Sequence, residues 1–114
     1  DAYTVMRIRP AIAPIDAAVL PLMEKSGLES VARDVHERIC AIPNLVSYYD
    51  GSGSIGRRYA RADEVGVPWA ITVDHDTLED GTVTIRRRDD GQQIRIAIEE
   101  IADLLITGKI STRF

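Results

Sequence analysis

The sequence predicts an α/β fold in which a five-stranded mixed β-sheet is covered by three α-helices. Apolar runs typical of strands alternate with helical periodicity over the first two thirds of the chain, an order that favours parallel strands joined by crossovers. The last third contains a strand of alternating polarity followed by a hairpin turn, which adds antiparallel strands. With 114 residues and 45% hydrophobic content, the chain is expected to bury one core.

The domain is expected to begin at about residue 15. Residues 1–14 form a mixed stretch with prolines and arginines, which we interpret as an extended linker, and residues 15–114 are assigned to the domain. Residues 15–22 are rich in Ala, Val and Leu, as is typical of a strand buried on both faces. Ser26 and Glu29 have the spacing of a capping box, which predicts a helix over 28–42.

The helix over 28–42 carries one apolar stripe that is expected to pack on the sheet. Glu37 and its charged neighbours fall outside the stripe. His36 and Cys40 lie in the same helix, and without an evident partner we interpret them as a solvated histidine and a partly buried thiol, not as catalytic groups. The stripe consists of Leu28, Val31, Ala32, Val35, Ile39 and Ile42.

A short strand over 45–49 leads to a second helix that is a candidate for ligand binding. Ser54 can cap this helix, and Gly66 is a natural end for it. Guanidinium groups match phosphates and the acceptor edges of bases, so the polar face of the helix that carries arginines is a candidate for binding such groups. By helical spacing, Ile55, Tyr59, Ala62 and Val65 face the core, whereas Arg57, Arg61 and Glu64 line another face.

The remaining elements complete the sheet. Strong β-formers predict a strand over 69–73, and the alternation over 82–88 predicts a strand with one wetter face. Asp89-Asp90-Gly91 is a hairpin turn signal, after which residues 92–96 return antiparallel. A last helix is expected over 97–107, ending at Gly108.

Asp74, His75 and Asp76 follow the third strand and contain possible metal ligands. On an extended chain, neighbouring side chains point to alternating faces, so these three are not expected to converge on one ion. No metal site is therefore predicted. The place remains of interest, because ligands bind beyond the carboxyl ends of strands in open α/β sheets.

Composition narrows the functional classes. The net charge of −4 argues against a non-specific nucleic-acid binder, but Arg57, Arg58 and Arg61 form one local basic cluster and residues 86–88 another. A single cysteine excludes an internal disulfide and fits a cytoplasmic protein, and no apolar run is long enough to span a membrane.

Two runs carry a resemblance to a known family. SGSIGRRYARADEVGVP and its continuation WAITVDHDTLEDGTVTIRRRDDGQQIRI closely resemble the C-terminal anticodon-binding domain of archaeal and eukaryotic-type glycyl-tRNA synthetases, which are class II aminoacyl-tRNA synthetases. The resemblance also covers IAPIDAAVLPL near the start. It implies the fold of the class IIa anticodon-binding domains and the anticodon of glycine tRNA as the ligand.

The resemblance also implies site residues. Those carried over are Arg57, Thr72, His75 and Arg88, where His75 replaces an aromatic ring that is common in the family. Glycine tRNAs carry cytosine at the second and third anticodon letters, and guanidinium donors match the acceptors O2 and N3 of cytosine. Arg61 is a further donor candidate, and Glu64 or Asp74 could accept from the cytosine amino group. On residues alone, pairing of Arg57 and Arg61 with Asp63 or Glu64 on a solvated helix face is as well supported.

The same resemblance implies that this domain is non-catalytic and holds no cofactor. ATP and magnesium would bind in a separate catalytic domain, which would attach glycine to its tRNA and form most of a homodimer interface. The alternative is a free-standing or recruited module that binds protein or structured RNA without aminoacylation. A small-molecule enzyme is disfavoured, since no nucleophile and base pair is visible.

Overall fold

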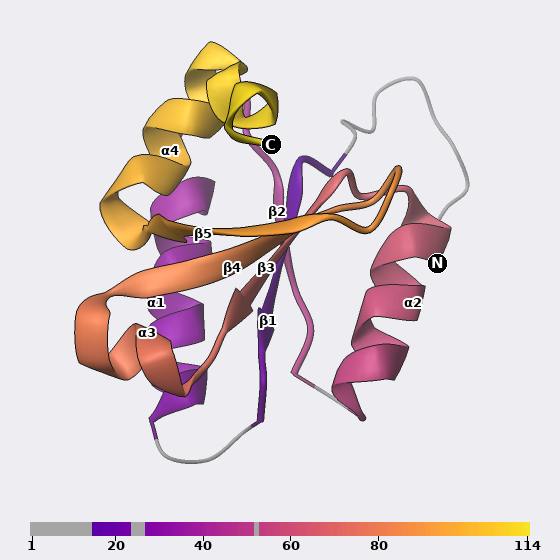
Figure 1. Cartoon of the computed structure of the whole chain (residues 1–114), viewed down its shortest axis with the longest axis vertical. Coiled ribbons are helices and arrows are strands. Elements are labelled where there is room, and N and C mark those ends of the chain that lie inside the picture. Colours follow the sequence, from indigo (N-terminus) through magenta and orange to yellow (C-terminus); the bar gives the residue numbers. More distant parts are fainter. Residues whose placement is uncertain (1–14, 24–26, 52) are drawn as a thin grey trace.

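The computed structural model describes residues 15–23, 27–51 and 53–114 (Figure 1). The expected linker over 1–14 and the expected helix cap at Ser26 lie outside these residues. In the described part, no helix is both long and apolar enough to cross a membrane.

The described strands form one five-stranded mixed sheet, as the sequence predicts. Its order is β2-β1-β3-β4-β5. The first three strands in this order run parallel, and β4 is antiparallel to both of its neighbours. The strands are β1 (Ala17–Pro21), β2 (Ser47–Tyr49), β3 (Trp69–Val73), β4 (Thr82–Arg87) and β5 (Gln93–Ala97).

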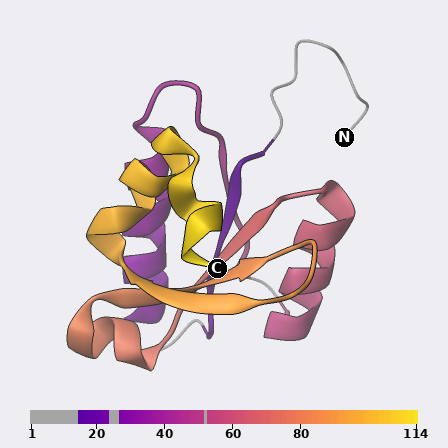
Figure 2. The same cartoon turned by 45° about the horizontal axis from the view of Figure 1, so that its top comes forward.

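Helices cover the two faces of the sheet unequally. α1 (Leu28–Cys40) and α4 (Ile98–Thr107) lie together on one face, and a 3₁₀ turn over Lys109–Arg113 follows α4. α2 (Ile55–Val65) lies alone on the other face (Figure 2). The larger core therefore lies under α1 and α4, where Val35, Ile71 and Ile85 are among its buried members.

The second core is small because α2 reaches only part of its face. Ala62 of α2 and the nearby Val67 pack against Ala18, Leu20 and Ala70 of β1 and β3. No residue of β4 or β5 belongs to this cluster of buried residues. The α2 side of β4 and β5 is consequently left without a helix over it.

A short helix that the sequence analysis missed follows β3, so the prediction of three α-helices is wrong by one. α3 (His75–Asp80) begins where Asp74 caps it: the Thr77 backbone N–H donates to Asp74 Oδ1 at 3.2 Å, and the Asp74 N–H donates to Thr77 Oγ1 at 3.0 Å. The expectation that Asp74, His75 and Asp76 continue an extended strand is therefore wrong. Six residues are too few to show a helical period.

α2 has the predicted ends, and three of the four residues expected to face the core, Ile55, Tyr59 and Ala62, pack there. The Arg57 N–H donates to Ser54 Oγ at 3.3 Å, and Gly66 ends the helix with a φ of 89°. Val65, expected inside, is 57% exposed, whereas Arg58 is only 4% exposed. The reason is that the Arg58 guanidinium donates to the carbonyl oxygens of Pro21 and Gly53, which gives the buried charge its partners.

Candidate nucleic-acid interface

A polar surface occupies the part of the sheet that α2 does not cover. In β4 and β5, Val83, Ile85 and Ile96 are buried on the α1 side. Apart from Ala97 at the end of β5, the residues that alternate with them on the α2 side are polar and at least partly exposed, and we call these polar residues, together with Thr72 of β3, the open face. Its members in the two strands are Thr82, Thr84, Arg86, Gln93 and Arg95.

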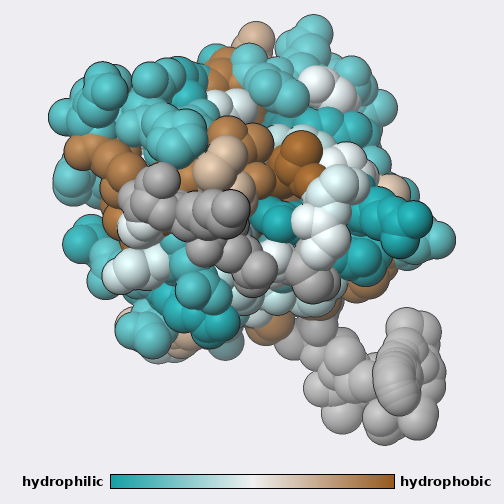
Figure 3. Space-filling model, turned by 90° about the horizontal axis from the view of Figure 1, so that it is seen from below, coloured by the Kyte–Doolittle hydropathy of each residue, from teal (hydrophilic) through white to brown (hydrophobic). Residues whose placement is uncertain are grey.

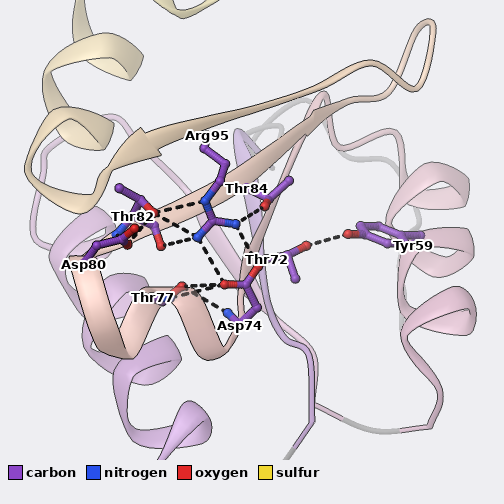
Figure 4. Close-up of polar contacts among 8 residues, drawn as sticks. All are labelled: Tyr59, Thr72, Asp74, Thr77, Asp80, Thr82, Thr84 and Arg95. Atoms are coloured by element: carbon purple, nitrogen blue, oxygen red, sulfur yellow. Dashed lines mark hydrogen bonds and ion pairs between the residues drawn. The ribbon is translucent and has the colours of Figure 1, made fainter.

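Arg95 is the most heavily bonded residue of the open face (Figure 4). Its Nη1 and Nη2 donate to the two oxygens of Asp74 at 2.9 and 3.1 Å. Its Nε donates to Thr82 Oγ1 at 3.0 Å, and Nη1 also donates to Thr84 Oγ1 at 2.8 Å. These bonds join β5, β4 and the start of α3 into one polar network.

Asp74 is engaged on both of its carboxylate oxygens. Besides Arg95, Oδ1 accepts from the backbone and the hydroxyl of Thr77. The Arg95 guanidinium holds the pKa of the Asp74 carboxyl below its usual range, with the Thr77 bonds acting in the same direction. To accept a hydrogen bond from a cytosine amino group, Asp74 would have to share oxygens that already accept hydrogen bonds from Arg95 and Thr77.

A second polar connection ties α2 to the open face. Tyr59, which points from α2 across the sheet, lies 2.5 Å from Thr72 through their two hydroxyl oxygens (Figure 4). Arg86 lies over the Tyr59 ring, 5.1 Å from its centroid, and bonds Asp63 at 3.2 Å. Thr72 itself is only 5% exposed, so its hydroxyl lies beneath this group and not at the surface.

The other candidates on α2 lie on a different face of that helix. Arg61 forms a two-point pair with Asp50, at 2.6 and 3.1 Å, instead of the pair with Asp63 or Glu64 that was considered from the sequence. Arg57 and Glu64 are exposed. Within the described residues, the Arg57 side chain has no hydrogen-bond or ion-pair partner, so its donors are available to a ligand.

His75 and Arg88 lie at opposite ends of β3. His75 is exposed at the first position of α3, just beyond the carboxyl end of the strand. Arg88 lies beside the amino end, because its N–H donates to Pro68 O at 2.9 Å and its Nε to Asp63 O at 3.2 Å. The five residues of β3 place about 17 Å between these ends, so the two side chains do not meet on one base.

The amino end of β3, near Arg88, and its carboxyl end, near His75, have different surroundings. Arg88 lines an open hollow of about 330 Å³ together with Asp63 and Asp89. Seen from below, the molecule is mainly hydrophilic, with hydrophobic residues exposed near the middle of the view (Figure 3). At the carboxyl end, Met23, which lies two residues beyond the parallel strand β1, is 38% exposed, and Leu78 of α3 is 45% exposed.

Tyr59 and the members of the open face in β4 and β5 were not among the predicted site residues. The alternation of the strand over 82–88 correctly placed Thr84 and Arg86 on its wetter face. Arg95 could not be located without the hairpin register, which sets it opposite Thr84. Tyr59 was assigned to the core because it follows the helical spacing of apolar residues.

The groups that were set aside as non-catalytic have partners. His36 is half-buried, with Nδ1 2.7 Å from Ser47 Oγ, so its interpretation as a solvated residue without a partner is wrong. Cys40 is exposed instead of partly buried, and its Sγ lies 3.6 Å from His36 Nε2. No group of three His, Cys, Asp or Glu residues suited to a metal ion occurs in the part of the chain that the structure describes.

Comparison with protein families gives a match over nearly the whole described chain. Residues 16–107 match the family described as anticodon binding domain. Among solved structures, the RNA binding domain of threonyl-tRNA synthetase from Cryptosporidium parvum Iowa II has a TM-score of 0.75 at 19% identity, covering 82% of this chain and 23% of that one. At that identity the likeness supports the fold alone.

Several curated glycine-tRNA ligases are similar to this chain. That of Methanothermobacter thermautotrophicus is 50% identical over 102 residues, which cover 90% of this chain and 18% of the ligase. That of Aeropyrum pernix is 57% identical over 95 residues, which cover 82% of this chain and 16% of the ligase. That of Bifidobacterium longum is 50% identical over 103 residues, which cover 90% of this chain and 21% of the ligase. This chain thus spans about a fifth of the length of these relatives.

Proposed function

Because the chain belongs to the anticodon-binding domain family, we propose that it is the anticodon-reading domain of a glycine-tRNA ligase and binds the anticodon of glycine tRNA. One observation carries the proposal: glycine-tRNA ligases of archaea and bacteria are similar to this chain over most of its length. The open face supports it chemically, because it offers guanidinium groups and hydroxyls to unpaired bases.

The activity of the whole protein is part of the proposal. A separate catalytic domain would attach glycine to the tRNA with ATP and magnesium, in the cytoplasm, and would provide most of a homodimer interface. The relatives extend well beyond the stretch that this chain matches, which leaves room for such a domain in them. The contribution of this chain would be to select the tRNA.

We assign different nucleotides to the two exposed arginines. Arg57 lies in the first turn of α2, whereas Arg88 bonds the carbonyl of Asp63 near the end of that helix. Six residue positions separate Arg57 from Asp63, which is about 9 Å along the helix axis, so we place the two guanidiniums at different bases. Each guanidinium would therefore donate to O2 and N3 of a different cytosine, and His75 would stack on a neighbouring base.

Substitution of these arginines tests the proposal. Arg57→Ala and Arg88→Ala should each weaken binding of glycine tRNA by about 1 to 3 kcal/mol, because each removes a donor group from a base edge. Fluorescence anisotropy with labelled glycine tRNA would measure the change. Arg38→Ala is the matched control, since Arg38 is exposed on α1, behind the sheet, and pairs only with Asp34 among the described residues.

The control should bind like the wild-type chain. Unchanged affinity in both Arg57→Ala and Arg88→Ala, with the fold intact by circular dichroism, would argue against base reading by these residues. A wild-type chain that binds no glycine tRNA would instead favour the recruited module that binds protein or another structured RNA.

A further inference from the structure

We propose that Arg95 presents the flat face of its guanidinium as a stacking plane for one unpaired base of the anticodon loop, a role that rests on the proposed function. Arg95 was not among the residues that the sequence indicated. It differs from Arg57 and Arg88 in what it has left to offer a ligand, because its donors are already used inside the protein.

The rim of the Arg95 guanidinium is occupied. A guanidinium has five N–H donors in one plane. Those of Arg95 meet both oxygens of Asp74, the hydroxyls of Thr82 and Thr84, and the carbonyl oxygen of Thr82 at 3.0 Å. Arg95 therefore cannot read the edge of a base without breaking one of these bonds, two of which hold the start of α3 to the sheet.

The flat sides of the group are what remain for a ligand. The Arg95 side chain is still 35% exposed, although Asp74, Thr82 and Thr84 surround its rim (Figure 4). Because hydrogen bonds occupy the rim, the part of the guanidinium left for a base is its flat face turned away from the sheet. Guanidinium planes stack on unpaired bases, and a plane that is already fixed by several hydrogen bonds loses little conformational freedom when a base settles on it.

The position of Arg95 suits a base that enters from the carboxyl end of β3. Arg95 bonds Asp74, the residue that precedes the exposed His75. On its other side, Arg95 lies opposite Thr84, and Thr84 lies opposite Thr72, where Tyr59 is bonded. A base on the Arg95 plane would thus lie between His75 and the Tyr59 ring, with flat groups on both sides.

The lysine variant separates stacking from simple charge attraction. Arg95→Lys keeps the positive charge that a phosphate would need but removes the plane. We expect roughly tenfold weaker binding of an anticodon stem-loop of glycine tRNA, and the same loss when either cytosine is replaced by uracil, because stacking tolerates any base. Isothermal titration calorimetry with the 114-residue chain would measure both.

Arg87→Lys is the matched control. Arg87 belongs to the same hairpin on the opposite side of the sheet, where it also makes a two-point pair, with Asp90 at 2.6 and 3.1 Å, and lies over the Phe114 ring. The Arg87→Lys variant should bind the stem-loop with the same affinity as the wild-type chain. Equal losses in both lysine variants would overturn the proposal, because the effect would then come from the hairpin and not from the open face.

Abasic ligands identify the stacked position. Removing one anticodon base at a time should reveal a single position at which Arg95→Lys no longer weakens binding, since the stack is already gone. If the loss in Arg95→Lys is below twofold, or stays the same for every abasic ligand, Arg95 has no stacked base. This result would leave the proposed function intact, because base discrimination by the wild-type chain is measured separately.

A readout on the wild-type chain makes the test independent of how well the variant folds. The Nε–H proton of Arg95, followed by NMR, should move upfield when the stem-loop binds, since it would enter the shielding cone above a base. The Arg87 Nε–H should stay in place. An Arg95 signal that does not move, or that moves downfield, with saturating stem-loop would overturn the proposal.

Discussion

Arg58 is a charged residue that belongs to the interior of the protein. It is 4% exposed, and its guanidinium donates to the carbonyl oxygens of Pro21 and Gly53. These contacts join the first turns of α2 to the end of β1 and to the loop before the helix. Arg58 thereby fixes the part of α2 that displays its exposed neighbour Arg57.

Replacing Arg58 should therefore cost stability that replacing Arg57 does not. In Arg58→Ala, two carbonyl groups lose their donor, so we expect the free energy of unfolding to fall by about 2 to 4 kcal/mol. Arg57→Ala removes an exposed side chain and should stay within about 0.5 kcal/mol. Urea denaturation followed by circular dichroism would compare them, and equal stability of the two variants would contradict the assignment.

Individual side-chain partners were the least predictable feature of the site. The sequence grouped Arg57, Arg58 and Arg61 as one basic cluster, because it contains the charges but not the distances between elements. In the fold, these arginines point to solvent, to the interior and to Asp50, respectively. Only the packing of α2 on β1 and β3 decides among these outcomes.

Long elements with a clear period could be predicted from the sequence. The strand at 69–73 agrees with the structure at both ends, and the apolar stripe of α1 correctly gives Leu28, Ala32, Val35 and Ile39 as buried. α3 could not be found by periodicity. Its available signal was the side-chain capping pair of Asp74 and Thr77, three residues apart, which the sequence analysis did not use.

The stripe of α1 gives a direct test at this scale. Val35 is 1% exposed and packs in the larger core, so Val35→Asp would bury a charge without a partner and should abolish cooperative unfolding. Glu37→Lys, two residues away on the exposed side, should change the stability by no more than about 0.5 kcal/mol. A cooperative thermal transition near that of the wild type in Val35→Asp would mean that α1 presents another face to the sheet.

At the scale of the whole molecule, helices cover the two sides of the sheet unequally, so one side is mainly buried and apolar and the other is partly open and polar. The side under α1 and α4 holds most of the buried apolar residues, whereas the α2 side leaves β4 and β5 open. Arg86 and Arg95 lie on this open face, and Arg57 and Arg88 are exposed elsewhere. A chain with a net charge of −4 can therefore still present local positive charge to RNA.

Binding of glycine tRNA with altered anticodon letters tests the central claim most directly. The wild-type chain should bind the native anticodon about 1 to 3 kcal/mol more tightly than a tRNA in which either cytosine is replaced by uracil, because N3 then becomes a donor that faces a guanidinium. Salt and tRNA sequence would otherwise be held constant, since phosphate contacts respond to salt and not to the base. Equal affinity for all of these tRNAs would contradict the account, because contacts to the backbone alone would then explain the binding.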